Sequence, residues 1–174
     1  MSLKVSRVVA CISTIILAFI FHFAYNLIPN FITSIFFPVN ESIWEHMKLL
    51  YTSILVYGII DYFLNIKFNL KYNNFFFNLF FLSYSSVVIY LLLFLPIYYS
   101  IGENMFISIG IMIITFIVVY VISYYILIMC SKKCDFLWVM PIILGYFLFG
   151  FLTYNPIRNQ LFFDTKDELY GIKK

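Results

Sequence analysis

The chain has 174 residues, of which 64% are hydrophobic and only 11% are charged, and its mean hydropathy is +0.98. Such a composition excludes an ordinary soluble domain, which needs a charged surface, and indicates a single-domain membrane protein. The net charge of +3 is small, and no basic cluster marks a soluble face, which excludes a nucleic-acid partner. The richness in Phe, Tyr, Ile, Asn and Lys is typical of an AT-rich bacterial genome.

Five apolar stretches are long enough to cross a bilayer, and they predict an all-α integral membrane bundle of five transmembrane helices. The predicted spans, within a transmembrane domain of residues 1–155, are residues 8–28, 40–66, 75–99, 105–130 and 136–154. The first span follows a short basic segment, but no small-residue cleavage site comes after it, so we expect an uncleaved helix. Residues 156–174 are too polar to span and form a C-terminal tail.

The connections between the spans carry further signals. Residues 29–39 are uncharged and too short to span, so we expect them to lie in the membrane interface. The second helix has two candidate N-caps, which are Asn40, or Ser42 with Glu45 at the capping-box spacing. In the fifth span, Gly145 and Gly150 permit close contact with another helix.

Basic residues predict the orientation in the plasma membrane, because cytoplasmic loops carry an excess of Lys and Arg. In the five-span arrangement one side receives Lys4, Arg7, Lys67, Lys71, Lys132 and Lys133. The two connections on the other side contain no Lys or Arg, so the N-terminus is predicted to be cytoplasmic and the C-terminus outside. The tail opposes this rule through Arg158, Lys166, Lys173 and Lys174.

The densest polar stretch is residues 38–48, which read Pro-Val-Asn-Glu-Ser-Ile-Trp-Glu-His-Met-Lys. Ionisable groups at membrane depth are energetically costly, so they face the bundle interior or water and are functional candidates. His22 lies about six residues before the predicted end of the first helix, and His46 about six after the start of the second. Both therefore sit roughly 9 Å below the outer boundary, and we expect them to approach each other.

Helical periodicity separates the candidate residues of the second helix. Glu41 and Glu45 share one stripe with Lys48, whereas His46 lies about 100° from Glu45 and roughly 140° from Glu41. One face of the helix therefore does not present both carboxylates and His46 to a single ion. We expect Glu45 and His46 to flank one pocket, with His22 and Asn26 arriving from the first helix.

Two functional interpretations follow. In the first, an outward-facing polar pocket between the first two helices binds or transports a small ligand or ion. Its candidate ligand-binding residues are Asn26, Asn40, Glu41, Ser42, Trp44 and Asp164. In the second, a membrane-embedded hydrolase acts on a lipid-linked or membrane-proximal substrate, with Glu45 and His46 as catalytic residues. In a metal-dependent form, a divalent metal is held by His22, Glu41, Glu45 and His46, since imidazole and carboxylate ligands suit zinc or manganese. In a metal-free form, a carboxylate–histidine pair acts as general acid and base or as a proton relay.

A structural interpretation competes with both. Glu41, Glu45 and Lys48 are also placed to cap the helix and to form ion pairs at its start, and Trp44 to anchor it at the interface. Asp61, near Lys67, is predicted to be an interfacial carboxylate. The lipid bilayer is the predicted partner, and the sequence leaves open a membrane-protein partner or a second copy of the chain.

The stretch P-V-N-E-S-I-W-E-H of residues 38–46 and the tail segments L-F-F-D and Y-G-I resemble an uncharacterised family of small bacterial multi-pass membrane proteins. Thr165 stands where that family has proline after the aspartate. The resemblance implies the architecture and the choice of site, and it implies no reaction. It also suggests that the tail folds back over the pocket and brings Asp164 towards it, whereas the alternative is a solvated terminus.

Overall fold

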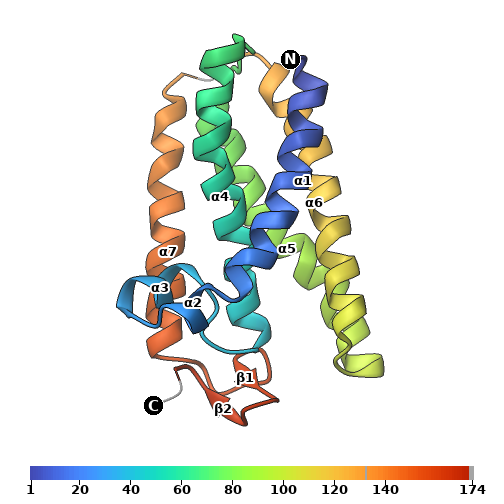
Figure 1. Cartoon of the computed structure of the whole chain (residues 1–174), viewed down its shortest axis with the longest axis vertical. Helices are drawn as coiled ribbons and strands as arrows, with labels where there is room; N and C mark the ends of the chain where they lie inside the picture. Colours follow the sequence, from blue (N-terminus) through green and yellow to red (C-terminus); the bar gives the residue numbers. More distant parts are fainter. Residues whose placement is uncertain (132, 173–174) are drawn as a thin grey trace.

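The computed structural model describes residues 1–131 and 133–172, so Lys132, Lys173 and Lys174, used above for orientation, lie outside it. The described chain forms an all-α bundle whose long helices run roughly side by side (Figure 1). The long helices are α1 (Leu3–His22), α4 (Ile43–Phe68), α5 (Phe75–Ile101), α6 (Met105–Ile128) and α7 (Val139–Tyr154), which follows the 3₁₀ turn η1 (Asp135–Trp138). Five segments of the described chain are long and apolar enough to cross a membrane, which confirms the predicted class.

Short elements lie at one end of the bundle, the end opposite the N-terminus (Figure 1). They are α2 (Ala24–Leu27) and α3 (Phe31–Phe36), between α1 and α4, and the antiparallel strands β1 (Phe163–Asp164) and β2 (Leu169–Tyr170). The strands form a small hairpin beneath the start of α4, and we call this side of the bundle the hairpin end.

The first two helices differ in extent from the sequence prediction. Helix α1 begins five residues earlier because the Ser2 hydroxyl accepts a hydrogen bond from the Val5 N–H, and it ends at His22, where the chain bends into α2. Helix α4 begins at Ile43, because Ser42 rather than Asn40 is its N-cap and accepts from the Glu45 N–H at 3.3 Å. Helices α5 and α6 begin at the predicted residues and end two residues from the predicted ends, whereas α7 begins three residues after the predicted start, because η1 precedes it.

Helix α4 is the centre of the bundle, with α1 and α5 packed against it. Its first half is enclosed on most sides, and Met47, Leu50 and Ile54 are buried. Because lipid is as apolar as these side chains, helices associate in a membrane through close packing and interhelical hydrogen bonds. Ala10 and Ala18 permit close packing of α1, because both are small and are buried in the same core.

A buried ion pair fixes the start of α4 to its neighbours. The Glu45 carboxylate accepts hydrogen bonds from Lys48 at 2.7 Å, from the Thr153 hydroxyl of α7 at 2.8 Å and from the Val39 N–H at 3.0 Å. The Lys48 ammonium also donates to the carbonyl oxygen of Ser34 at 2.6 Å. With Glu45 2% and Lys48 0% exposed, the pair ties α3 and the following loop to α4 and α7.

A second buried ion pair lies at the N-terminal end of the bundle. The Arg7 guanidinium of α1 donates to both carboxylate oxygens of Asp61 of α4, at 2.5 and 2.6 Å, and Tyr72 donates to the same carboxylate at 3.0 Å. The basic partner of Asp61 is therefore not the nearby Lys67 that the sequence suggests, because Arg7, 54 residues away on another helix, takes that place. Both carboxylate oxygens accept from the same guanidinium nitrogen, and such charge-assisted hydrogen bonds satisfy a carboxylate that is removed from water.

Gly145 is the predicted position at which α7 packs closely against α4. A Cβ atom at this position of α7 would overlap the Tyr51 hydroxyl, which donates to the Ile142 carbonyl oxygen at 2.9 Å. We expect Gly145→Ala to destabilise the protein by about 1–3 kcal/mol, because an overpacked core must shift its neighbours. Thermal unfolding in detergent measures this change. Gly110→Ala on α6 is the matched control, since nothing lies within 4 Å of its Cβ and it should gain up to about 1 kcal/mol of stability.

Candidate functional site

Three side chains from two helices and a loop converge at the hairpin end. His22 is the last residue of α1, His46 lies in the first turn of α4, and Glu41 is in the loop that leads into α4. Glu41 bridges the two rings, with Oε1 3.8 Å from His22 Nε2 and Oε2 3.4 Å from His46 Nε2. One ligand atom from each residue lies within 4.8 Å of the other two, and all three side chains are partly exposed.

The His46 ring has a defined orientation. Its Nδ1 lies 2.9 Å from the carbonyl oxygen of Ser42, and because a carbonyl only accepts, Nδ1 carries the hydrogen in this contact. In the neutral ring Nε2 is therefore the free electron-pair donor, and it faces Glu41. A ring held in this way by a backbone carbonyl is the usual arrangement of a metal-ligating histidine. The His22 ring stacks on it, with centroids 5.3 Å apart.

The charge of Glu41 is set by its neighbours. The contact with His46 is the largest cause that lowers the pKa of Glu41 to about 2; burial opposes this shift, and His22 and Lys166 add to it. Glu41 is therefore a carboxylate throughout the physiological range. An anionic oxygen pair between two imidazoles can serve as a hydrogen-bond acceptor or as a metal ligand.

The C-terminal tail supports the loop that carries Glu41. Asp164 is fully buried, and its Oδ2 accepts a hydrogen bond from the Glu41 N–H at 2.9 Å. Its Oδ1 accepts from the N–H groups of Lys166 and Asp167, which closes the turn of the hairpin. The Asn40 side-chain amide donates to the carbonyl oxygen of Gly171 at 2.7 Å. The tail thus folds back onto the start of α4, as the sequence suggests.

Trp44 joins the tail to the bundle. Its backbone N–H donates to the Leu161 carbonyl oxygen at 2.9 Å, and its ring stacks on Phe162 and packs against Phe149 of α7. A ring that is enclosed in this way is not an exposed interfacial anchor. Trp44 instead holds the segment before β1 against α4.

The structure brings together some of the predicted site residues and separates others. His22, Glu41 and His46 meet, whereas the Glu45 carboxylate is enclosed by Lys48 and Thr153 and does not face His46. Asn26 is exposed on α2. Four further residues hold the surrounding backbone, and a direct role for them in ligand binding stays a prediction: Asn40, Ser42, Trp44 and Asp164.

Glu41 and His46 approach each other because Glu41 precedes the helix. The angle of roughly 140° between them applies only when both residues are helical. With the first helical residue at Ile43, the extended backbone of Ser42 lets the Glu41 side chain turn towards the His46 ring. The Ser42 capping pattern in the sequence is the signal that predicts this arrangement.

Two further residues border the site, although no pattern in the sequence connects them with it. Glu103, between α5 and α6, lies close enough to His46 to interact electrostatically, and its carboxylate accepts a hydrogen bond from the Thr165 hydroxyl at 2.8 Å. Lys166 of the hairpin turn also lies close enough to His22 and Glu41 to interact with them electrostatically. No short-range pattern relates either residue to residues 38–48.

The fold defines a multi-pass helical membrane protein, whose apolar helices fit a lipid bilayer. Comparison with known protein families then identifies the family of the chain. Residues 4–172 match the family of unknown function DUF6512, and the chain belongs to this family, as the motifs of residues 38–46 and of the tail suggest. No curated protein and no solved structure matches the chain.

Proposed function

We propose that this membrane protein binds a divalent transition-metal ion, zinc by its donor set, through His22, Glu41 and His46. The observation that supports the proposal is the mutual approach of three ligand atoms within 4.8 Å. Ligand atoms about 2.1 Å from a tetrahedral zinc are about 3.4 Å apart. The three ligand atoms, which lie within 4.8 Å of one another, would therefore have to draw closer by up to about 1.4 Å around an ion.

The choice of metal follows from the chemistry of the ligands. Two imidazoles and one carboxylate suit zinc, and they are less suited to magnesium or calcium, which prefer oxygen ligands alone. The ligands come from α1, from the loop before α4 and from α4. Binding of the ion would therefore also hold these segments together.

Metal analysis of the purified protein tests this proposal. Protein purified in zinc-containing buffer and then freed of loose metal should retain about one zinc ion per chain, which a chelator removes. The alternative is a metal-free arrangement in which Glu41 only pairs with the two histidines. Protein that retains no zinc, manganese, cobalt or nickel after loading would support that alternative and refute the proposal.

We further propose that the hairpin end faces outside the cell and that the site opens there. The lysines of the N-terminal end, Lys4, Lys67, Lys71 and Lys133, support this orientation. A reporter fused after Glu103 should then be external, and one after Lys71 cytoplasmic. The opposite pair of signals would reverse the orientation.

The packing beneath the site favours binding of the ion over its passage. Directly below His46, towards the middle of the bundle, Leu50 and Ile54 of α4 are buried, and Ala18 of α1 belongs to the same core. An ion that moved on from the site would have to separate α1 from α4. Transport by this protein would therefore need a second conformation of these helices.

A hydrolase is the second candidate, and the number of ligands favours it. Structural zinc sites have four protein ligands, whereas catalytic sites have three and bind water in the fourth position. Zinc lowers the pKa of such a water to about 7, which provides a nucleophile at neutral pH. Zinc-dependent cleavage of a chromogenic ester or phosphate that disappears in His46→Ala would support this candidate, and equal cleavage by both proteins would refute it.

A further inference from the structure

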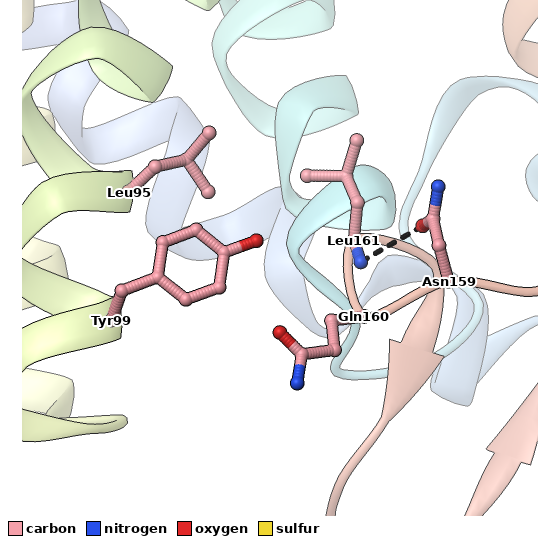
Figure 2. Close-up of a pocket in the computed structure, with 5 residues that line it drawn as sticks. All are labelled: Leu95, Tyr99, Asn159, Gln160 and Leu161. Carbon is pink, nitrogen blue, oxygen red and sulfur yellow. Dashed lines mark hydrogen bonds between the residues drawn. The ribbon is translucent and has the colours of Figure 1, made fainter.

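A cavity of about 530 Å³ lies at the hairpin end, apart from the three metal-ligand candidates. One wall is α5, with Leu95 and Tyr99, and the other is the segment before β1, with Asn159, Gln160 and Leu161 (Figure 2). Figure 2 shows the side chains of Tyr99 and Gln160 on facing sides of the gap. Ligand pockets in proteins commonly have volumes of roughly 300–1,000 Å³, so this space is large enough for part of an organic molecule.

The lining of the cavity changes in character along the bundle axis. Helix α5 runs towards the hairpin end, so Tyr99 lies about 6 Å nearer that end than Leu95. The apolar side chains of Leu95 and Leu161 face each other at one level, and the polar groups of Tyr99 and Gln160 lie beside them. Asn159 Oδ1 is already occupied, since it accepts from the Leu161 N–H at 3.0 Å.

Three polar side chains line the cavity, and two of them, Tyr99 and Gln160, provide free hydrogen-bond donors that face each other across it. Within residues 1–131 and 133–172, the Tyr99 hydroxyl and the Gln160 amide make no hydrogen bond to another protein group. None of the five lining residues is charged. A suitable ligand therefore has an apolar part and an uncharged acceptor, such as an ester carbonyl oxygen.

The cavity is continuous with the lipid-facing surface of α5. Tyr99 is 65% exposed, and Leu92, one turn before Leu95, is 69% exposed. Towards the hairpin end α5 and α6 also lean away from α4 and α7 (Figure 1). A bilayer lipid can therefore reach the cavity sideways, with its chain towards the bilayer centre and its ester groups towards the hairpin end.

We propose that this cavity is a binding site for one glycerolipid of the surrounding bilayer. An acyl chain lies between Leu95 and Leu161, and an ester carbonyl oxygen accepts from Tyr99 or Gln160. Since the lining carries no charge, the site does not distinguish zwitterionic from anionic headgroups. The lipid also supports the tail, because the carbonyl oxygen of Leu161, in the cavity wall, accepts a hydrogen bond from the backbone N–H of Trp44 at the start of α4.

Native mass spectrometry of the protein in mild detergent tests the site, in the presence of a chelator so that the result does not depend on metal. The parent should retain one glycerolipid per chain. Leu95→Trp and Leu161→Trp fill the cavity from opposite walls, and each should lower retention about tenfold, a loss of about 1.4 kcal/mol. Leu92→Trp is the matched control on the open lipid-facing side of α5 and should retain the parental amount.

Competition with added lipids tests the chemistry of the ligand. Zwitterionic and anionic diacylglycerolipids should displace the retained lipid equally, and a single-chain fatty alcohol without an ester should displace it at least tenfold less well. Circular dichroism confirms that each variant is folded. A parent without retained glycerolipid, parental retention in both folded cavity-filling variants, or equal displacement by the fatty alcohol would overturn the proposal.

Discussion

Replacing Lys48 with methionine is expected to lower the free energy of unfolding by about 3–5 kcal/mol, because it leaves the Glu45 carboxylate buried without its counter-ion. The side chain of Lys48 is fully buried and donates to Glu45, to Thr153 of α7 and to the Ser34 carbonyl oxygen. Methionine retains much of the volume and makes none of these contacts. Thermal or denaturant unfolding of the detergent-solubilised protein, followed by circular dichroism, measures the loss.

Two further variants separate the loss of the ion pair from a general intolerance of the position. In Glu45→Gln/Lys48→Met no charge remains buried, so we expect most of the lost stability to return. Lys67→Met changes an exposed lysine of the same helix and should stay within about 0.5 kcal/mol of the parent. If Lys48→Met is as stable as Lys67→Met, the ion pair contributes little to the fold.

The same ion pair connects stability to the site. Glu45 accepts from the Val39 N–H, and Lys48 donates to the carbonyl oxygen of Phe37 at 3.4 Å, so together they hold the loop that continues into Glu41. The position of Glu41 therefore depends on a pair that does not itself face the site. This accounts for the dense polar stretch of residues 38–48, which combines a structural pair with two metal-ligand candidates.

The sequence predicts the five helices well because each is a long apolar stretch, and hydropathy alone is sufficient to identify it. Which helix faces touch is a different matter. Arg7 and Asp61 are each consistent with an interfacial side chain, and only the packing of α1 on α4 makes them partners. Contacts between distant segments depend on how helices are aligned and rotated, which local periodicity does not determine.

In the candidate site, too, the sequence predicts what depends on local helix geometry and misses what depends on distant segments. His22 and His46 are predicted to meet from their distances to the helix ends, and the three residues that converge are among the four predicted metal ligands. Glu45 is the exception, since a helix turns about 100° per residue and directs it away from His46. Whether it faces water, metal or a buried lysine depends on α7, which supplies Thr153 and is more than 100 residues away.

His46→Ala should lower zinc affinity at least about 100-fold, because it removes one of three ligands, and even second-shell changes commonly reduce affinity by 10–100-fold. Asp164→Ala should lower it about tenfold, since the Glu41 N–H loses its acceptor and the loop that positions the carboxylate becomes less ordered. Glu168→Gln, on the exposed part of the same hairpin, should bind zinc as the parent does.

Zinc titration by calorimetry in detergent measures all three affinities, and helical content by circular dichroism confirms that the variants are folded. The order of the effects matters more than their size. A large effect of His46→Ala with a smaller one of Asp164→Ala is expected only if the ion lies between His22, Glu41 and His46 and the tail positions Glu41. If Asp164→Ala binds as tightly as Glu168→Gln, the hairpin only covers the site. If His46→Ala also binds as tightly as the parent, the zinc lies elsewhere, and His22, Glu41 and His46 form only an ion-paired cluster at the junction of α1 and α4.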